Sequence, residues 1–255
     1  MHILSYDVAS KSLAMSLIKF NDNWKSDLSN IKTSFDDNIK NISAEELCQT
    51  AIDHIDRLYE LLDTLIQPLV LDVVDLIPGK KVKETDVILR ANRLRGYLKH
   101  VDETHLAIIP VDESCHVLVE YQMGPNNKSN SVCSQILYHY ANDDNGFKST
   151  LNTELTDVVL TESTPNQKVY TIEIVGPSLK NKINLDKDKP RQFYIAKYAK
   201  TYDANKNHST ANMKYWLKTK NAEHMIANIK KSNLDDIADS VTMTLAWLFI
   251  KSGYL

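Results

Sequence analysis

The first twenty residues hold two short apolar runs separated by a polar turn. Residues 2–8 (HILSYDV) and 13–20 (LAMSLIKF) flank the sequence ASKS. Two such runs joined by a tight turn predict an opening β-hairpin. Residues 21–42 are polar and rich in Asn, Asp and Lys, so we expect a loop there with at most one irregular strand.

A helical pattern begins at Ser43. Ser43 and Glu46 have the spacing of a capping box, which satisfies free backbone N–H groups at the start of a helix. Apolar residues then recur at helical spacing until Pro68, which stops the pattern. The pattern predicts a helix at about 43–66.

Strand-like and helix-like segments alternate in the rest of the chain. Strands are predicted at 69–77, 116–121 and 169–176, and helices at about 86–103, from the loop at 124–130 to about 142, at 209–230 and at 234–252. The polar residues 143–167 predict a flexible excursion, and Pro177 and Pro190 predict an irregular course for the basic residues 177–208. This alternation after an opening hairpin indicates an α/β fold with a mixed central sheet flanked by helices.

Composition restricts the class of protein. The chain has 255 residues, of which 43% are hydrophobic and 25% charged, as in a soluble globular protein of one large domain or two small ones. No apolar run has the roughly 18–20 residues that cross a bilayer, and the first residues lack a secretion signal. We therefore expect a cytoplasmic protein. Three widely spaced cysteines, Cys48, Cys115 and Cys133, fit neither a disulfide framework nor a zinc site.

The net charge of −3 hides a marked asymmetry. Residues 1–75 carry 13 acids and 6 bases, whereas residues 187–231 carry 11 bases and 3 acids, and residues 76–100 are also basic. Such clustering is typical of a phosphate-binding surface, although each cluster taken alone is equally explained as a solvated face. The candidates for contact with a DNA backbone are Arg93, Arg95, Lys80, Lys81 and Lys128.

Two acidic residues interrupt apolar strand patterns. Asp7 lies near the end of the first predicted strand, and Glu120 lies among Val and Leu residues at 116–121. A carboxylate in such a place is costly unless something compensates its charge. Each also has a purely structural explanation, because Asp7 can cap the turn and Glu120 can face water from an edge strand.

The last predicted helix starts with further acids. Asp236 and Asp239 are three residues apart and therefore share a helix face, and the apolar remainder of the helix predicts burial. The helix dipole favours acids at this end, so capping is the alternative explanation. Asp235, four residues before Asp239, shares the face as well. Together, these segments supply the hard oxygen ligands that Mg²⁺ or Mn²⁺ prefers, and two such ions can hydrolyse a phosphodiester.

These segments resemble one family. ILSYDVASKSLAMSLIKF is similar to the first motif of RuvC-like Holliday junction resolvases, VLVEYQMGPNNKSNSV to the second and DDIADSVTMTLAW to the C-terminal one. The match is closer to the versions in nucleocytoplasmic large DNA viruses (poxvirus-, iridovirus- and mimivirus-like), which share the DLIPGKKVKETD-type and VGPSLKNK stretches. The resemblance runs over most of residues 1–20 and 69–252, and the helix at 43–66 looks like an addition.

The resemblance implies a single RNase H-like nuclease domain over residues 1–255, with a C-terminal catalytic helix. It implies a homodimer that cleaves four-way DNA junctions with paired symmetric nicks, requires magnesium and accepts manganese as a substitute. It also implies a place at viral DNA replication sites in the cytoplasm of an infected cell.

The resemblance also implies roles for particular residues. The expected catalytic metal ligands are Asp7, Glu120, Asp236 and Asp239. Asp236 is preferred to Asp235 because the family spacing is three. The family places a lysine near the scissile phosphate, for which Lys206 is the first candidate and Lys182 the second.

Other functions remain open for the same residues. An RNase H-like nuclease that acts on other branched DNA or on RNA–DNA hybrids would use the same carboxylates. A non-catalytic DNA-binding module would keep the fold, and a scaffold would use the long helix at 43–66. The presence of every expected acid favours an enzyme.

Overall fold

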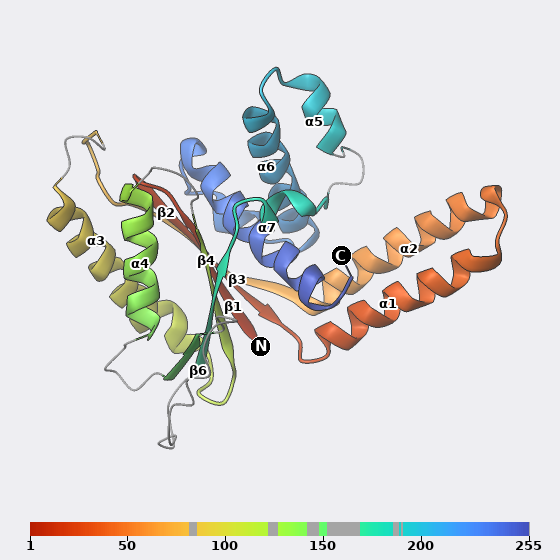
Figure 1. The fold of residues 1–255 in the computed structure, drawn as a ribbon, viewed down its shortest axis with the longest axis horizontal. Coiled ribbons are helices and arrows are strands. Elements are labelled where there is room, and N and C mark those ends of the chain that lie inside the picture. Colours follow the sequence, from red (N-terminus) through yellow and green to blue (C-terminus); the bar gives the residue numbers. More distant parts are fainter. Residues whose placement is uncertain are drawn as a thin grey trace.

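The computed structural model describes residues 1–81, 86–121, 127–141, 148–151, 169–185, 189 and 191–254. Within these residues, a central six-stranded sheet carries helices on both faces (Figure 1). In chain order the strands are β1 (His2–Val8), β2 (Ser12–Phe20), β3 (Ile66–Asp75), β4 (Cys115–Glu120), β5 (Lys148–Leu151) and β6 (Val169–Val175). Their order across the sheet is β3-β2-β1-β4-β6-β5.

The sheet is mixed. β2 runs antiparallel to both β1 and β3, whereas β4 is parallel to β1, and β6 is parallel to β4 and β5. Parallel neighbours need crossover connections; α3 (Val87–His100) lies in the connection from β1 to β4, and α4 (Asn127–Ala141) lies in the connection from β4 to β6. The predicted α/β class and the opening hairpin are confirmed, and the arrangement is that of an RNase H-like fold.

Helices form a layer on each face of the sheet (Figure 1). In chain order, the α-helices of the described residues are α1 (Trp24–Asn38), α2 (Ala44–Leu65), α3 (Val87–His100), α4 (Asn127–Ala141), α5 (Arg191–Lys197), α6 (Thr201–Thr219) and α7 (Leu234–Lys251). The helices α3 and α4 pack on one face, and α7 packs on the other with α6 against it. Among the described residues, no helix has the length and apolar character needed to span a membrane.

Alternating residues of β1 divide the core in two. Ile3 packs with α7, whereas Leu4 and Tyr6 pack with α3 and α4 on the opposite face. The alternation follows from strand geometry, in which successive side chains point to opposite faces. Ser5 lies on the α7 side, where its hydroxyl is hydrogen-bonded to that of Thr244. The face of β1 that includes Ser5 is therefore fixed against the C-terminal helix.

The prediction for residues 21–42 was wrong. The helix α1 occupies most of this segment and pairs with α2 to form a long hairpin that projects from the sheet (Figure 1). Only Trp24 and Leu28 of α1 are buried, so the segment has too few apolar positions to show a helical period. The predicted capping box between Ser43 and Glu46 is confirmed.

The course of residues 177–208 also differs from the prediction. Both α5 and the first turns of α6 lie there, and α6 begins at Thr201 and not near residue 209. The buried face of α6 includes His208, Ser209 and Asn212, and the Ser209 hydroxyl is hydrogen-bonded to Thr242. The inner face of α6 mixes polar and apolar side chains, so it gives no continuous apolar stripe to recognise.

The segment 143–167, predicted to be a flexible excursion, contains strand β5 (Lys148–Leu151). β5 pairs in parallel with β6 and extends the sheet. The other residues of this predicted excursion lie outside the described residues.

We predict that Leu245→Ala lowers the free energy of unfolding by about 2–5 kcal/mol, because a fully buried side chain leaves a cavity when truncated. Ile88→Ala is the matched control, since Ile88 is exposed on α3, and it should change stability by about 0.5 kcal/mol or less. Urea denaturation measures both. Equal losses in the two variants would contradict the packing of α7 described above.

Candidate active site

Two carboxylates meet at one end of the sheet. β1 and β4 are parallel neighbours, so the residues at their C-terminal ends, Asp7 and Glu120, come close together. Both side chains are buried, and Glu120 is 0% exposed. The explanation of Glu120 as a solvent-facing residue of an edge strand is wrong, since β4 lies between β1 and β6.

The third contribution comes from the start of α7. Asp239 is buried at 6% exposure and faces the two strand carboxylates. Asp236 lies one turn earlier and accepts a hydrogen bond of 2.7 Å from the hydroxyl of Ser12, at the start of β2. The structure thus brings acids from three distant segments into one place, as expected from their sequence pattern.

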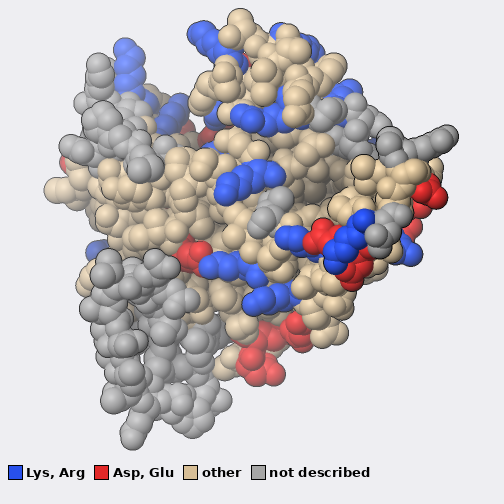
Figure 2. All heavy atoms as spheres, turned by 45° about the vertical axis from the view of Figure 1, so that its right-hand side comes forward, with Lys and Arg blue, Asp and Glu red and all other residues tan. Residues whose placement is uncertain are grey.

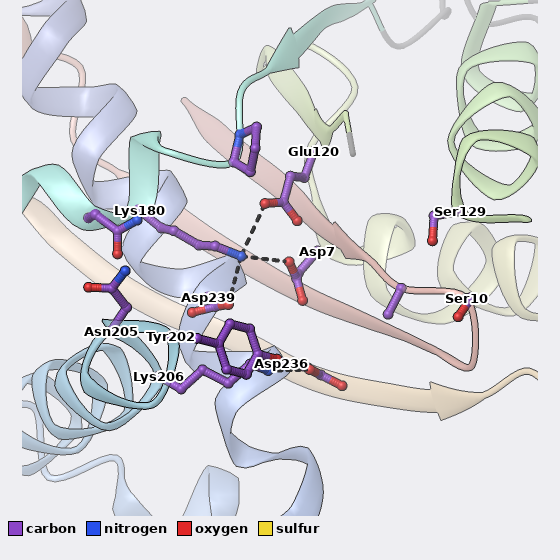
Figure 3. A pocket seen from close by; sticks show the side chains of 13 residues that line it. Asp7, Ser10, Glu120, Ser129, Lys180, Tyr202, Asn205, Lys206, Asp236 and Asp239 are labelled. Carbon is purple, nitrogen blue, oxygen red and sulfur yellow. Dashed lines mark hydrogen bonds and ion pairs between the residues drawn. The ribbon is translucent and has the colours of Figure 1, made fainter. Parts of the chain in front are cut away.

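A lysine lies at the centre of these acids. The Nζ atom of Lys180 is 3.2 Å from Asp7 Oδ1, 3.1 Å from Glu120 Oε1 and 2.6 Å from Asp239 Oδ2 (Figure 3). Lys180 belongs to a short 3-10 turn, η5 (Leu179–Lys182), that follows β6. The ammonium group is therefore the counter-ion of all three carboxylates.

Sequence reasoning missed Lys180. It selected Lys206 and then Lys182, and Lys182 is exposed on the same turn. One signal in the sequence could have identified Lys180. This lysine lies in VGPSLKNK, directly after a strand that runs parallel to the strand of Glu120. Parallel strands end at the same side of a sheet, so a lysine shortly after β6 falls beside Glu120.

Lys206 has different partners. It projects from α6 and forms ion pairs with Asp235 and, at 3.6 Å, with Asp236 Oδ1. Asp236 lines the same cavity as Asp7 and Glu120. Asp235 is held by Lys206 at the start of α7, so the geometry favours Asp236 over Asp235 as a member of the carboxylate group.

The acids and Lys180 line a cleft of about 370 Å³. Ser10 of the β1–β2 turn, Ser129 of α4 and Tyr202 of α6 form its other walls (Figure 3). Hydroxyl, ammonium and carboxylate groups thus surround a single open space. An arrangement of this kind can accept a phosphate group and a hydrated cation.

Burial shifts the proton affinities of the site. Burial and the hydrogen bond with Glu120 raise the pKa of Asp7 well above its usual range, although Lys180 opposes the shift. Burial and the charge of Asp7 raise the pKa of Asp239 to about 6. Burial lowers the pKa of Lys180, but the three carboxylate charges outweigh it and the net shift is upward. A cation at this point is therefore strongly favoured.

The donor set fits a hard divalent cation. It consists of carboxylate oxygens, which suit Mg²⁺ and Mn²⁺ better than zinc. Among the described residues, however, no group of three or more acidic, His or Cys side chains is spaced to hold a metal as it stands. The ammonium group of Lys180 occupies the point between Asp7, Glu120 and Asp239.

None of the described candidates for DNA contact lines this cleft. Arg93 and Arg95 belong to α3, on the sheet face opposite α7. Their neighbour Arg90 is only 4% exposed and donates a hydrogen bond to Ser131. Burial of Arg90 at the α3–α4 contact reduces the basic surface of α3 that is open to a ligand.

The remaining candidates are Lys80, Lys81 and Lys128. Lys80 and Lys81 are exposed after β3, in the segment where the Leu76 N–H donates to the Lys11 carbonyl of the β1–β2 turn. Lys128 lies in the first turn of α4, and its side chain lies outside the described residues.

Fold and site together define an α/β protein of RNase H-like arrangement with a buried carboxylate centre. The model of the family described as Poxvirus A22 protein, the poxvirus Holliday junction resolvase family, matches residues 146–251 of this chain. The expected similarity to poxvirus-type resolvases is therefore confirmed, and it supports the role of a resolvase-type nuclease. No curated protein and no solved structure matches the chain.

The match covers less than half of the chain. It includes Lys180, Lys206, Asp236 and Asp239 but stops short of Asp7 and Glu120. Lys180 lies in the matched part of the chain and pairs with Asp239 of the same part and with Asp7 and Glu120 outside it.

We predict a pH-dependent effect of Asp239→Asn on stability without divalent metal. The folded-state pKa of Asp239, about 6, exceeds its ordinary value of 3.8. Its contribution to stability is therefore present below about pH 4 and lost as the pH rises through about 6. Relative to the wild type, Asp239→Asn should gain on the order of 3 kcal/mol between pH 4 and pH 7.5.

Urea denaturation in EDTA at these two pH values measures the effect. Asp27→Asn, in the first turn of α1 and outside the carboxylate cleft, is the control and should show no such gain. A stability difference between wild type and Asp239→Asn that is the same at both pH values would contradict the prediction.

Proposed function

We propose that this protein is a magnesium-dependent endonuclease that resolves four-way DNA junctions. The observation that carries the proposal is the convergence of Asp7, Glu120 and Asp239 on a single cation in an open cleft. The similarity of residues 146–251 to poxvirus resolvases supports the substrate class.

In the proposed site, the ligands of a two-metal phosphodiester hydrolysis would be Asp7, Glu120, Asp236 and Asp239, which all line the cleft. Bound magnesium supplies an activated water and stabilises the leaving oxygen of a phosphodiester. The Ser12 hydroxyl orients Asp236 through its hydrogen bond. Lys206 keeps Asp235 and Asp236 paired at the start of α7, so the acids of this helix stay in one orientation.

A basic and aromatic surface on α5 and α6 lies beside the cleft, and we assign DNA binding to it. Lys197 lies over the rings of Phe193 and Tyr198 at 5.9 and 5.6 Å. Lys206 lies 5.3 Å from the ring centroid of Tyr202, which is 66% exposed and lines the cleft. Figure 2 shows basic side chains over this upper part of the molecule. Lysines attract phosphates, and exposed rings stack on unpaired bases.

Two symmetric cuts in one junction require two active sites. A homodimer with two-fold symmetry supplies them, so we propose this assembly. Light scattering of the chain with and without junction DNA tests it. A monomer in both conditions would contradict the homodimer, while leaving the nuclease chemistry unaffected.

The central test is cleavage by Asp7→Asn. Loss of this carboxylate should reduce magnesium-dependent cleavage of a four-way junction by about 10³-fold or more, because the site would lose a metal ligand. Each tenfold loss in rate corresponds to about 1.4 kcal/mol of lost transition-state stabilisation. Junction binding should persist, since the basic and aromatic side chains of α5 and α6 are unchanged in this variant. Asp27→Asn is the control and should cleave normally. A wild-type rate in Asp7→Asn would overturn the proposal.

A panel of substrates distinguishes the neighbouring functions. Paired nicks in opposing strands of a junction support a resolvase. Preferential cutting of RNA–DNA hybrids or flaps would assign the same site to another RNase H-like nuclease. Binding without turnover on any substrate would indicate a non-catalytic DNA-binding module.

The α5–α6 surface makes a prediction about salt. Replacing Lys197 and Lys200 by Ala should weaken junction binding and reduce the slope of log K against log[salt] by about 2, since each phosphate contact contributes about 0.9. The double variant Lys25→Ala, Lys40→Ala, on the α1–α2 hairpin, is the control with the same charge change. Equal slopes for the wild type and the Lys197/Lys200 variant would exclude this surface.

A further inference from the structure

The position of Lys180 has a consequence for how the site takes up a cation. Its ammonium group contacts one oxygen of each of three buried carboxylates, at 2.6 to 3.2 Å. Magnesium would bind oxygens at about 2.0–2.1 Å and bring them closer together. The ammonium group and a divalent ion therefore compete for the same centre.

The three carboxyl groups need a cation between them when they are ionised. Asp7, Glu120 and Asp239 are all at most 6% exposed, and buried acids that lie close together repel each other unless a positive charge separates them. With the ammonium group in place, one oxygen of each acid lies within 3.2 Å of a common point, although the acids are not yet spaced to hold a metal. The lysine thus preserves the site in the absence of metal.

The lysine also has a route out of the centre. Lys180 is anchored by its backbone on η5, whose Leu179 is buried, while its flexible four-carbon stem lines the cleft. The ammonium group can move into the cleft by side-chain rotation alone. Figure 3 shows the stem extending across the cleft from η5 towards the acids.

We propose that Lys180 is a placeholder for the metal ion. Without metal, its ammonium group holds Asp7, Glu120 and Asp239 together, and a divalent ion displaces it into the cleft. The inference rests on the proposed function only in taking these three acids as ligands. The competing ammonium group weakens the apparent metal affinity, because the protein binds metal only after this group has left.

Manganese binding to Lys180→Met tests the placeholder. In EDTA-treated full-length protein at pH 8, calorimetry with Mn²⁺ alone should give a dissociation constant about tenfold or more below the wild-type value, because no ammonium group competes. The metal-free variant should melt about 5 °C or more below the wild type, since three buried acids have lost their counter-ion. Lys182→Met, an exposed lysine on the same turn, should change neither value.

The opposite results overturn the inference. Wild-type or weaker Mn²⁺ affinity in folded Lys180→Met would mean that the lysine does not compete with the metal. If neither protein binds Mn²⁺, the three acids are not metal ligands and the inference fails. If Lys180→Met does not fold without metal, the wild type provides the test by reductive methylation and peptide mass spectrometry. Lys180 should be protected in EDTA and modified with saturating Mn²⁺, and equal modification in both states would exclude displacement.

These readouts are independent of DNA cleavage. Tighter Mn²⁺ binding by Lys180→Met in a protein that cuts no DNA would preserve the placeholder and reject the nuclease. If the protein cleaves DNA but Lys180→Met leaves the Mn²⁺ affinity unchanged, the nuclease is supported and the placeholder is rejected.

Discussion

The burial of three negative charges at one point is the constraint on which the site depends. Asp7, Glu120 and Asp239 are each costly to remove from water, and together they repel one another. The fold tolerates them because η5 delivers the ammonium group of Lys180 to the same point. Three features of the fold bring these charged groups together: the parallel pairing of β1 with β4, the turn after β6 and the start of α7.

The C-terminal helix α7 sets the geometry of that balance. It is buried from Ile237 to Phe249, so its orientation on the sheet is fixed by packing on most sides. Two hydroxyl pairs, Ser5 with Thr244 and Ser209 with Thr242, add directional contacts to β1 and α6. Buried polar groups that are paired in this way specify register, since a shift would leave them without partners.

The charge asymmetry of the sequence corresponds to separate parts of the molecule. The acidic N-terminal part includes the projecting α1–α2 hairpin, whereas the basic residues 187–231 include α5 and α6 beside the cleft (Figures 1 and 2). On the proposed function, an acidic hairpin repels the phosphate backbone and a basic surface attracts it. The near-neutral total charge therefore conceals a directed electrostatic field.

The sequence alone determined the features that depend on near neighbours: the opening hairpin, the capping box at Ser43, the buried C-terminal helix and the set of acids. Apolar period and capping are local signals, so these predictions did not need the fold. Only the tertiary structure decided that Lys180 and not Lys206 lies among the three acids, and that Asp236 lines the cleft. Those choices depend on which strands and helices lie side by side in the fold, and this arrangement brings together residues as far apart in the chain as Asp7 and Lys180.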